Sequence, residues 1–528
     1  MIVLGDYMQQ FKKQNNIFTI ILSILLGISF SLKKLIKSDL FISNFKITTL
    51  ILWSIIFTII SFLIINAILY SLEKIKLKTN MFKEKKLLII SFLVIFLSGL
   101  LFLVVHYPGV GFYDTFLILD HPVAAAPQHP IFYNLLIGIP FRILRLIFKD
   151  INFIYFLISL GQLILCSCIL TYIISWFNRT IKNKLFTIIL LLYFSIIPIV
   201  SNYNMMLIKD SLFGIIFIFY IPLLYELIKS KGKILDNKKY LICLGITLLL
   251  TTLLRNNGIY VIMFTMIILT IFYKKYYKKL IALLLIVIIL SHIPNLFIKN
   301  KILFQEKVGI PIQQIAYVVK YNENSISKKD KDYLNKLMDL ELIKEKYDYS
   351  IVDPIKWDAS FNSNYLDKTK TKFIKTWFNI MKNNFSNYVK SYLLMTYNLW
   401  AIDKYNPSQS RYLTLDVKGY VNRSDTFTEL KNTNILPERI NTKLKEFYDY
   451  TTIYVGNGLL FYTMLLISLY AFINKKKELI ILFLPIIGVY LTLLISAPIS
   501  YALRYMSTYL YCLPILILII IKNKRLSK

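Results

Sequence analysis

Apolar residues gather in blocks of about 16–26 residues, and short lysine-rich runs separate these blocks. A helix needs about 20 apolar residues to cross the hydrocarbon core of a bilayer, so each block predicts a membrane-spanning helix. Twelve such blocks occur, at residues 17–32, 47–70, 87–105, 151–177, 185–200, 212–228, 240–254, 258–273, 280–298, 458–473, 479–496 and 506–521. The pattern predicts an all-α polytopic membrane protein.

Composition agrees, because 56% of the residues are hydrophobic and only 17% are charged. Soluble domains carry about 25% charged residues, so an ordinary soluble fold is excluded. The first block lacks a small-residue cleavage site and further blocks follow it, which predicts a retained anchor. All cysteines lie inside apolar blocks and offer neither a disulfide framework nor a Cys-x-x-Cys pattern.

The formal charge of +33 reflects membrane topology, because the basic residues lie in short runs between the apolar blocks and do not line one continuous surface. We therefore expect no nucleic-acid partner. The loop 71–86 holds six lysines against two glutamates and should be cytoplasmic. The segment 106–130 has no lysine or arginine but holds Asp114 and Asp120, so it should lie outside.

Residues 131–148 are apolar but carry a polar stripe at helical spacing, which predicts an amphipathic helix lying in the outer interface. The stripe consists of Asn134, Gly138, Arg142, Arg145 and Lys149. With this helix outside, every later lysine cluster falls inside, at 179–184, 229–239, 274–279, 475–477 and 522–528. This assignment places both termini in the cytoplasm of a multi-pass plasma-membrane protein. The same assignment places the loop 33–46 outside. This loop holds four lysines and one aspartate, so it departs from the depletion of basic residues in outer loops.

One long segment, 299–457, differs in composition, since it holds 18 of the 29 acidic residues and 25 of the 62 basic ones. It predicts a mainly helical extracellular domain. The expected organisation is a membrane domain at 1–298 that includes a catalytic-type outer loop at 106–150, then the outer domain, then a membrane domain at 458–528.

Candidate chemistry concentrates in the outer loop, which holds Asp114, Asp120 and three of the four histidines. A turn-rich loop in which Asp114 caps a helix is the simplest alternative, and Asp120 fits that structural role. The histidine spacings match no zinc pattern, so we assign no metal site and leave a divalent metal open as a cofactor.

Three basic residues remain in the other short outer loops, where topology depletes them: Lys209, Arg255 and Arg504. A lysine at the outer boundary is a natural phosphate partner, and Lys209-Asp210 is alternatively a self-paired structural couple. Either arginine could instead serve as an interfacial anchor.

The ordered motifs of the chain are Tyr107-Pro108-Gly109, Tyr113-Asp114-Thr115, His129-Pro130, Lys209-Asp210 and Gln313-Gln314-Ile315-Ala316. An acidic residue just past a span, followed by an in-plane helix and a His-Pro dipeptide, resembles the first outer loop of GT-C membrane glycosyltransferases. These include the protein O-mannosyltransferase and aminoarabinose transferase branches, and the motif order is most similar to an uncharacterised bacterial branch. Gln313 and Gln314 are expected to pack the outer domain on the membrane domain.

The resemblance implies inverting transfer of a sugar from a polyprenyl-phosphate lipid to a glycan, lipid or protein acceptor in the cell envelope. Asp114 would be the general base. The substrate-binding residues would be Tyr113, His129, Lys209, Asp210, Arg255 and Arg504. Two alternatives stay open. An O-antigen-type ligase or polymerase would depend on an arginine and not on Asp114, and a polysaccharide or lipid flippase would need charged residues near span centres.

Overall fold

The computed structural model describes residues 17–38, 40–43, 45–75, 77–126, 128–298, 302–403, 415–417, 420, 424–451, 456–496 and 499–523. Every regular element in these ranges is a helix, and the only β-type pairing there consists of isolated bridges. The all-α prediction is therefore confirmed for the described part of the chain.

Eight helical segments of the described residues are long and apolar enough to cross a membrane. They are Ile17–Lys37 (α2), Ile47–Lys74 (α4), Glu84–Val105 (α5), Ile151–Ile181 (α8), Lys209–Lys229 (α11 and α12), Lys274–Leu296 (around α15), Glu478–Ser496 (around α27) and Leu503–Lys522 (around α28). The pair α9 (Lys184–Ile196) and α10 (Pro198–Met205) bends by 64° and makes a ninth if counted as one span. The chain is thus an all-α multi-pass membrane protein, while the count of twelve spans stays a prediction.

The other elements of the bundle are shorter. Within the long segments the helices are α11 (Lys209–Phe217), α12 (Tyr220–Lys229), α15 (Tyr277–His292), α27 (Leu484–Ser496) and α28 (Ser507–Lys522), and beside them lie α13 (Lys238–Leu254), α14 (Gly258–Phe272) and α26 (Asn457–Ile473). Short 3₁₀ turns occupy η1 (Lys233–Asp236), η2 (Lys274–Tyr276), η3 (Ile293–Phe297), η4 (Glu323–Ser325), η6 (Asp425–Phe427), η7 (Lys477–Phe483) and η8 (Leu503–Met506).

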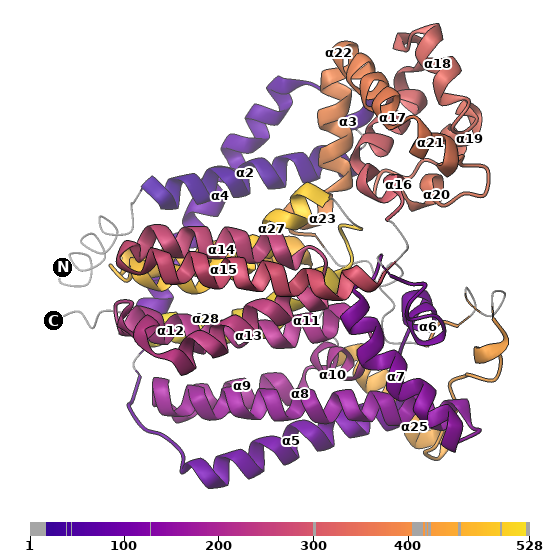
Figure 1. Ribbon diagram of the computed structural model, residues 1–528. Helices are drawn as coiled ribbons and strands as arrows, with labels where there is room; N and C mark the ends of the chain where they lie inside the picture. The colour runs from indigo at the N-terminus through magenta and orange to yellow at the C-terminus, as the bar shows by residue number, and fades with distance from the viewer. Residues whose placement is uncertain are drawn as a thin grey trace.

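The long helices run side by side, and the lysine-rich segments meet at one end of the bundle (Figure 1). Lys522 Nζ and Asn183 Nδ2 both donate to the carbonyl of Lys78, at 3.3 and 2.8 Å. At the same end, Lys279 Nζ forms an ion pair with Asp236 Oδ1 at 2.7 Å. The short α6 (Tyr113–Asp120) and α7 (Ile131–Ile147) lie at the opposite end (Figure 1).

The polar stripe of α7 does not behave as one surface. Arg142 and Arg145 are exposed, whereas Asn134 is buried and its Nδ2 donates to the carbonyl of Pro122 at 2.8 Å. The prediction that Asn134 faces the interface is therefore wrong, because the loop before α7 folds back and takes up its amide. The exposed side of α7 is largely apolar, with Leu146 88% exposed.

Residues 302–395 form a helical module with its own core, separate from that of the bundle (Figure 1). Its helices are α16 (Phe304–Lys307), α17 (Gly309–Asn322), α18 (Lys328–Leu334), α19 (Leu340–Lys346), α20 (Asp353–Lys356), α21 (Ser363–Lys368) and α22 (Lys370–Met395). The N-terminal elements contribute Leu35 of α2 and Phe41 of α3 (Leu40–Ser43) to this core.

The chain after the module packs differently, since Leu399, Phe427 and Tyr448 belong to the core of the bundle. They lie in or beside α23 (Tyr397–Trp400), η6 and α25 (Glu438–Thr451). The segment predicted as one outer domain, 299–457, thus packs in two parts, and its boundaries stay a prediction.

Gln313 and Gln314 bond within the module and not across to the bundle. Gln313 Nε2 donates to the carbonyl of Asp348 at 2.5 Å, and Gln314 Oε1 accepts from Trp377 Nε1 at 2.9 Å. The expectation that they pack the module on the membrane domain is wrong, because α17 is buried along its length from Ile312 to Val319 and both amides bond to other parts of the module.

The lysines of the loop 33–46 that ran against the charge trend are partly neutralised by Asp403. Lys33 and Lys37 reach its Oδ1 at 3.3 and 2.7 Å, and Lys34 lies 3.0 Å from the ring centroid of Trp53. Because Lys33 and Lys37 belong to α2, these contacts tie that helix to the segment that follows the module.

Candidate active site

The loop before α6 is fixed by close contact with α8. The hydroxyl of Tyr155 donates to the carbonyl of Val110 at 2.8 Å. Gly109 has φ of 143°, and a Cβ there would lie 2.9 Å from both the Tyr155 ring and Ser159 Oγ. Only glycine fits this turn without strain, because side chains rarely adopt that backbone conformation. These contacts fix the loop against α8, and so they also fix the position at which α6 begins, Tyr113.

Asp114, in the first turn of α6, forms an ion pair with Arg504 of η8. Arg504 Nη1 donates to Asp114 Oδ2 at 2.9 Å, and the side chains are 12% and 29% exposed respectively. An acid in the first helical turn is also favoured by the helix dipole. The carboxylate therefore keeps partial access to solvent while a guanidinium holds one of its oxygens.

The charge state of Asp114 is set by opposing effects. Burial alone would raise the pKa of its carboxyl, but the Arg504 cation, and then that of Lys209, outweigh burial and lower it. The group is thus an anion at neutral pH.

His129 and Lys209 form a second polar contact beside this pair. Lys209 Nζ lies 2.9 Å from His129 Nδ1, and the imidazole is 3% exposed. Burial, and then the Lys209 cation, lower the pKa of His129 to about 3. The imidazole is therefore neutral, accepts from Lys209 through Nδ1 and carries its proton on Nε2. That Nε2 is buried without a hydrogen-bond partner.

Asp210 and Arg255 form a third contact, at the start of α11 and the end of α13. Arg255 Nη1 lies 3.1 Å from Asp210 Oδ1, with the two side chains 9% and 1% exposed. Ser507 Oγ donates to the carbonyl of Asp210 at 2.8 Å and ties α11 to α28. A buried charge is costly unless it is paired, so each residue accounts for the burial of the other.

Tyr505 contacts both arginines. Its ring centroid lies 4.9 Å from the guanidinium carbon of Arg504 and 5.1 Å from that of Arg255. Phe112 and Phe213 provide further rings, at 4.9 Å from Arg504 and 5.4 Å from Arg255. Aromatic faces attract cations within about 6 Å, so these rings fix both guanidiniums.

The structure brings six of the seven predicted site residues together at one end of the bundle: Asp114, His129, Lys209, Asp210, Arg255 and Arg504. With His129 neutral, three cations face two carboxylates, which leaves a net charge of +1. A weakly hydrated cluster with this charge is suited to a phosphate monoanion.

Tyr113 makes a ring contact outside these pairs, since its ring meets that of Tyr420 edge-on at 5.5 Å. The hydroxyls of Tyr420 and Thr426 each donate to Asp120 at 3.0 Å. Asp120 thus ties the end of α6 to the segment after the module, in agreement with its expected structural role.

The three loop histidines do not converge. His106 stacks on Phe102 at 4.2 Å, and burial lowers the pKa of His106 to about 4. His121 lies beside Asp120 at 3.4 Å, while His129 contacts Lys209. Within the described residues, no group of three or more His, Cys, Asp or Glu side chains is arranged to hold a metal ion.

Sequence reasoning missed Tyr505 as a member of the cluster. Its neighbour Arg504 was the available signal, because a tyrosine next to a functional arginine at a span end is a natural ring for that cation. The pairing with Arg255 could not be found in this way, since that arginine is 250 residues away in the chain.

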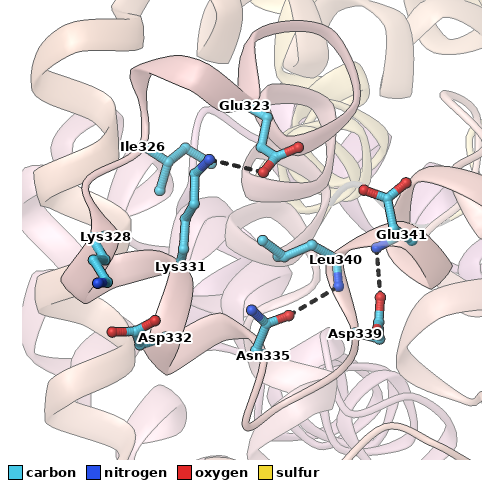
Figure 2. Close-up of a pocket in the computed structure, with 9 residues that line it drawn as sticks. All are labelled: Glu323, Ile326, Lys328, Lys331, Asp332, Asn335, Asp339, Leu340 and Glu341. Carbon is cyan, nitrogen blue, oxygen red and sulfur yellow. Dashed lines mark hydrogen bonds and ion pairs between the residues drawn. The ribbon is translucent and has the colours of Figure 1, made fainter.

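A polar pocket of about 560 Å³ lies on the module and includes no residue of this cluster; it is lined by Glu323, Ile326, Lys328, Lys331, Asp332, Asn335, Asp339, Leu340 and Glu341 (Figure 2). Its groups largely satisfy one another: Lys331 pairs with Glu323 at 2.8 Å, and Asp339 accepts from the backbone of Glu341 at 2.7 Å (Figure 2). Because Asp339 caps α19, the pocket has a structural explanation and is not the candidate site.

One family model matches residues 107–528 of the chain, and its description is a family of unknown function (DUF6020). The match begins in the loop between α5 and α6 and includes every residue of the cluster. No curated protein and no solved structure matches the chain.

Proposed function

The chain belongs to DUF6020, a family of unknown function, so we propose a function from its own site: transfer of a sugar from a polyprenyl-phosphate lipid to a cell-envelope acceptor. The observation that carries the proposal is the pairing of Asp114 with Arg504 inside a cluster of three cations. An accessible carboxylate beside a phosphate-type cation site is what inverting transfer from a lipid phosphate requires.

In the proposed reaction, Asp114 takes the proton from the acceptor hydroxyl. The hydroxyl oxygen then forms a bond to the anomeric carbon, and the bond from that carbon to the phosphate oxygen breaks. The electron pair of the broken bond leaves with the polyprenyl phosphate. The charge on this phosphate therefore changes from −1 in the donor to −2 in the product. No second carboxylate is needed, because the transfer inverts the anomeric centre in one step.

The cations stabilise the leaving phosphate. Arg504 and Arg255 present planar guanidiniums, and Lys209 presents a single ammonium. Neutral His129 accepts from Lys209 and so orients it without adding charge.

The proposed topology has twelve crossings, with both termini cytoplasmic and the cluster at the outer face of the plasma membrane. The lysine-rich segments at the opposite end of the bundle support this orientation, because positive loops favour the cytoplasm. The exposed apolar side of α7, with Arg142 and Arg145 beside it, supports an in-plane helix at the outer interface. Residues 299–457 would then be extracellular.

An O-antigen-type ligase or polymerase is the second candidate, and the depth of Arg255 favours it, since a buried arginine paired with Asp210 could bind a diphosphate lipid. That reaction would survive the loss of Asp114. The two functions therefore differ in their dependence on one residue.

The test compares the surface glycans of cells that lack the protein, carry the wild type or carry Asp114→Asn. The proposal expects one glycan structure to disappear without the protein and to stay absent with Asp114→Asn at equal membrane abundance. Full restoration by Asp114→Asn would overturn the base assignment and favour the ligase. An unchanged glycan profile in cells lacking the protein would overturn both.

A further inference from the structure

Tyr505 links two ion pairs that belong to different parts of the fold. It follows Arg504 in η8, directly before α28, and its hydroxyl accepts from Arg504 Nη2 at 3.0 Å. Its ring also contacts Arg255, which lies at the end of α13. The two ring distances limit the separation of the guanidinium carbons to about 10 Å.

Two arginines at such a separation repel each other in a site with little water. Their carboxylate partners differ: Asp114 belongs to α6 and Asp210 belongs to α11. Each ion pair alone fixes its arginine only relative to the helix that carries its carboxylate, and not relative to the other arginine. A tyrosine ring offers negative π-density to both cations, so it can hold the two guanidiniums in one arrangement when no anion is bound.

We propose that Tyr505 is a positioning residue that holds Arg255 and Arg504 as one binding unit for the phosphate of the lipid donor. The proposal rests on the proposed sugar transfer. Tyr505 acts through the arginines and needs no contact with the reacting atoms.

The effect on catalysis follows from preorganisation. Cations that are already in place when the sugar leaves the phosphate stabilise the developing charge without moving first. Without the ring, each guanidinium loses the contact that it shares with the other and keeps only its own carboxylate and its own neighbouring phenylalanine ring, so the donor phosphate must order the two arginines relative to each other. Loss of Tyr505 therefore weakens donor binding and slows transfer at saturating donor.

The experiment measures the affinity of the purified full-length chain in lipid nanodiscs for a sugar-free, short-chain polyprenyl phosphate. Tyr505→Leu removes the ring and should weaken binding by about 10- to 100-fold, the range of two cation–π contacts. Tyr505→Phe keeps the ring and loses one hydroxyl acceptor, so it should weaken binding only by about two- to tenfold. Tyr509→Phe on α28 is the matched control, because its buried hydroxyl donates to the carbonyl of Ile486.

A double-mutant cycle separates positioning from a general structural role. In an Arg255→Gln background, Tyr505→Leu should cost clearly less affinity than in the wild type, because one of its two targets is gone. Equal costs in both backgrounds would mean that Tyr505 acts independently of Arg255 and would overturn the inference. Thermal unfolding midpoints of all variants identify any that fail to fold, and Tyr505→Phe then carries the comparison.

The outcomes also separate this inference from the proposed function. Wild-type protein that does not bind the lipid phosphate would show that the proposed donor is wrong. Wild-type binding that is unchanged in folded Tyr505→Leu would leave the donor intact and overturn the role of Tyr505 alone.

Discussion

Arg504 and Asp114 are separated by 390 positions in the chain, yet Arg504 Nη1 donates to Asp114 Oδ2 at 2.9 Å. The same guanidinium donates to the Tyr505 hydroxyl through Nη2. Under the proposed reaction, the donor phosphate competes with Asp114 for this arginine. The base is therefore held by a cation in the free protein and becomes a stronger base when the phosphate takes that cation.

Asp114→Asn should reduce sugar transfer by about 10²–10⁴-fold, the contribution of a positioned general base. The amide keeps the size of the side chain and can still accept from Arg504, but it cannot take the acceptor proton. Transfer to the native acceptor, measured in membranes at equal protein abundance, checks this.

Asp120→Asn is the matched control for that variant, because Asp120 is on the same short helix and bonds to Tyr420 and Thr426. Its loss should lower the thermal unfolding midpoint and leave most of the transfer rate. A large rate loss in both variants at normal stability would contradict a specific role for Asp114.

Arg504→Gln should move the acid limb of the pH–rate profile upward by about 1–3 pH units. Burial opposes ionisation of Asp114, and Arg504 is the first of the groups that overcome it and lower the pKa of this carboxyl. Without the cation the pKa rises, and the base becomes protonated at a higher pH. The profile of kcat/KM against pH reports this value for the free protein, and an unmoved acid limb would contradict the assignment.

The helical framework was predictable because the membrane imposes a simple rule: apolar blocks must become helices, since lipid satisfies no backbone groups. The cluster members were predictable for a related reason. Lysines and arginines are depleted from outer loops, so Lys209, Arg255 and Arg504 stood out in loops that the predicted topology places outside.

The pairing of those residues was not predictable, because it depends on which helices pack together. Nothing in the sequence near Asp114 points to Arg504, and nothing near Arg255 points to Tyr505. For Asn134 a prediction was possible from the sequence, and it was wrong. Its helical spacing predicted an exposed stripe, but the preceding loop folds over it. Gln313 and Gln314 failed similarly, since the core of the module can only be seen in three dimensions.

The stability of the protein should fall as pH drops from about 6.5 to about 3, in part through His129. Its pKa is lowered to about 3 in the fold, whereas an unfolded histidine titrates near 6.5. In this window the unfolded chain binds the proton that the native imidazole excludes, so stability is lost with a limiting slope of about 1.4 kcal/mol per pH unit.

His129→Gln removes this titration and keeps an acceptor for Lys209. Thermal unfolding of purified protein should therefore be less sensitive to pH between about 6.5 and 4.5 in this variant than in the wild type. Equal sensitivity in the two proteins would show that His129 is not held neutral in the native site.

The proposed topology makes a direct prediction about which surface positions an impermeant thiol reagent can reach in intact cells. Single cysteines are introduced into a background in which the four native cysteines are replaced by alanine. Lys231→Cys and Lys275→Cys lie at the lysine-rich end of the bundle and should be protected, whereas Lys336→Cys in the module should be labelled; all three positions are exposed to solvent. Permeabilised cells provide the control, because there all three variants should react. Labelling of Lys231→Cys in intact cells would reverse the orientation and place Asp114 on the cytoplasmic face, where nucleotide sugars are available and a lipid-linked donor is no longer required.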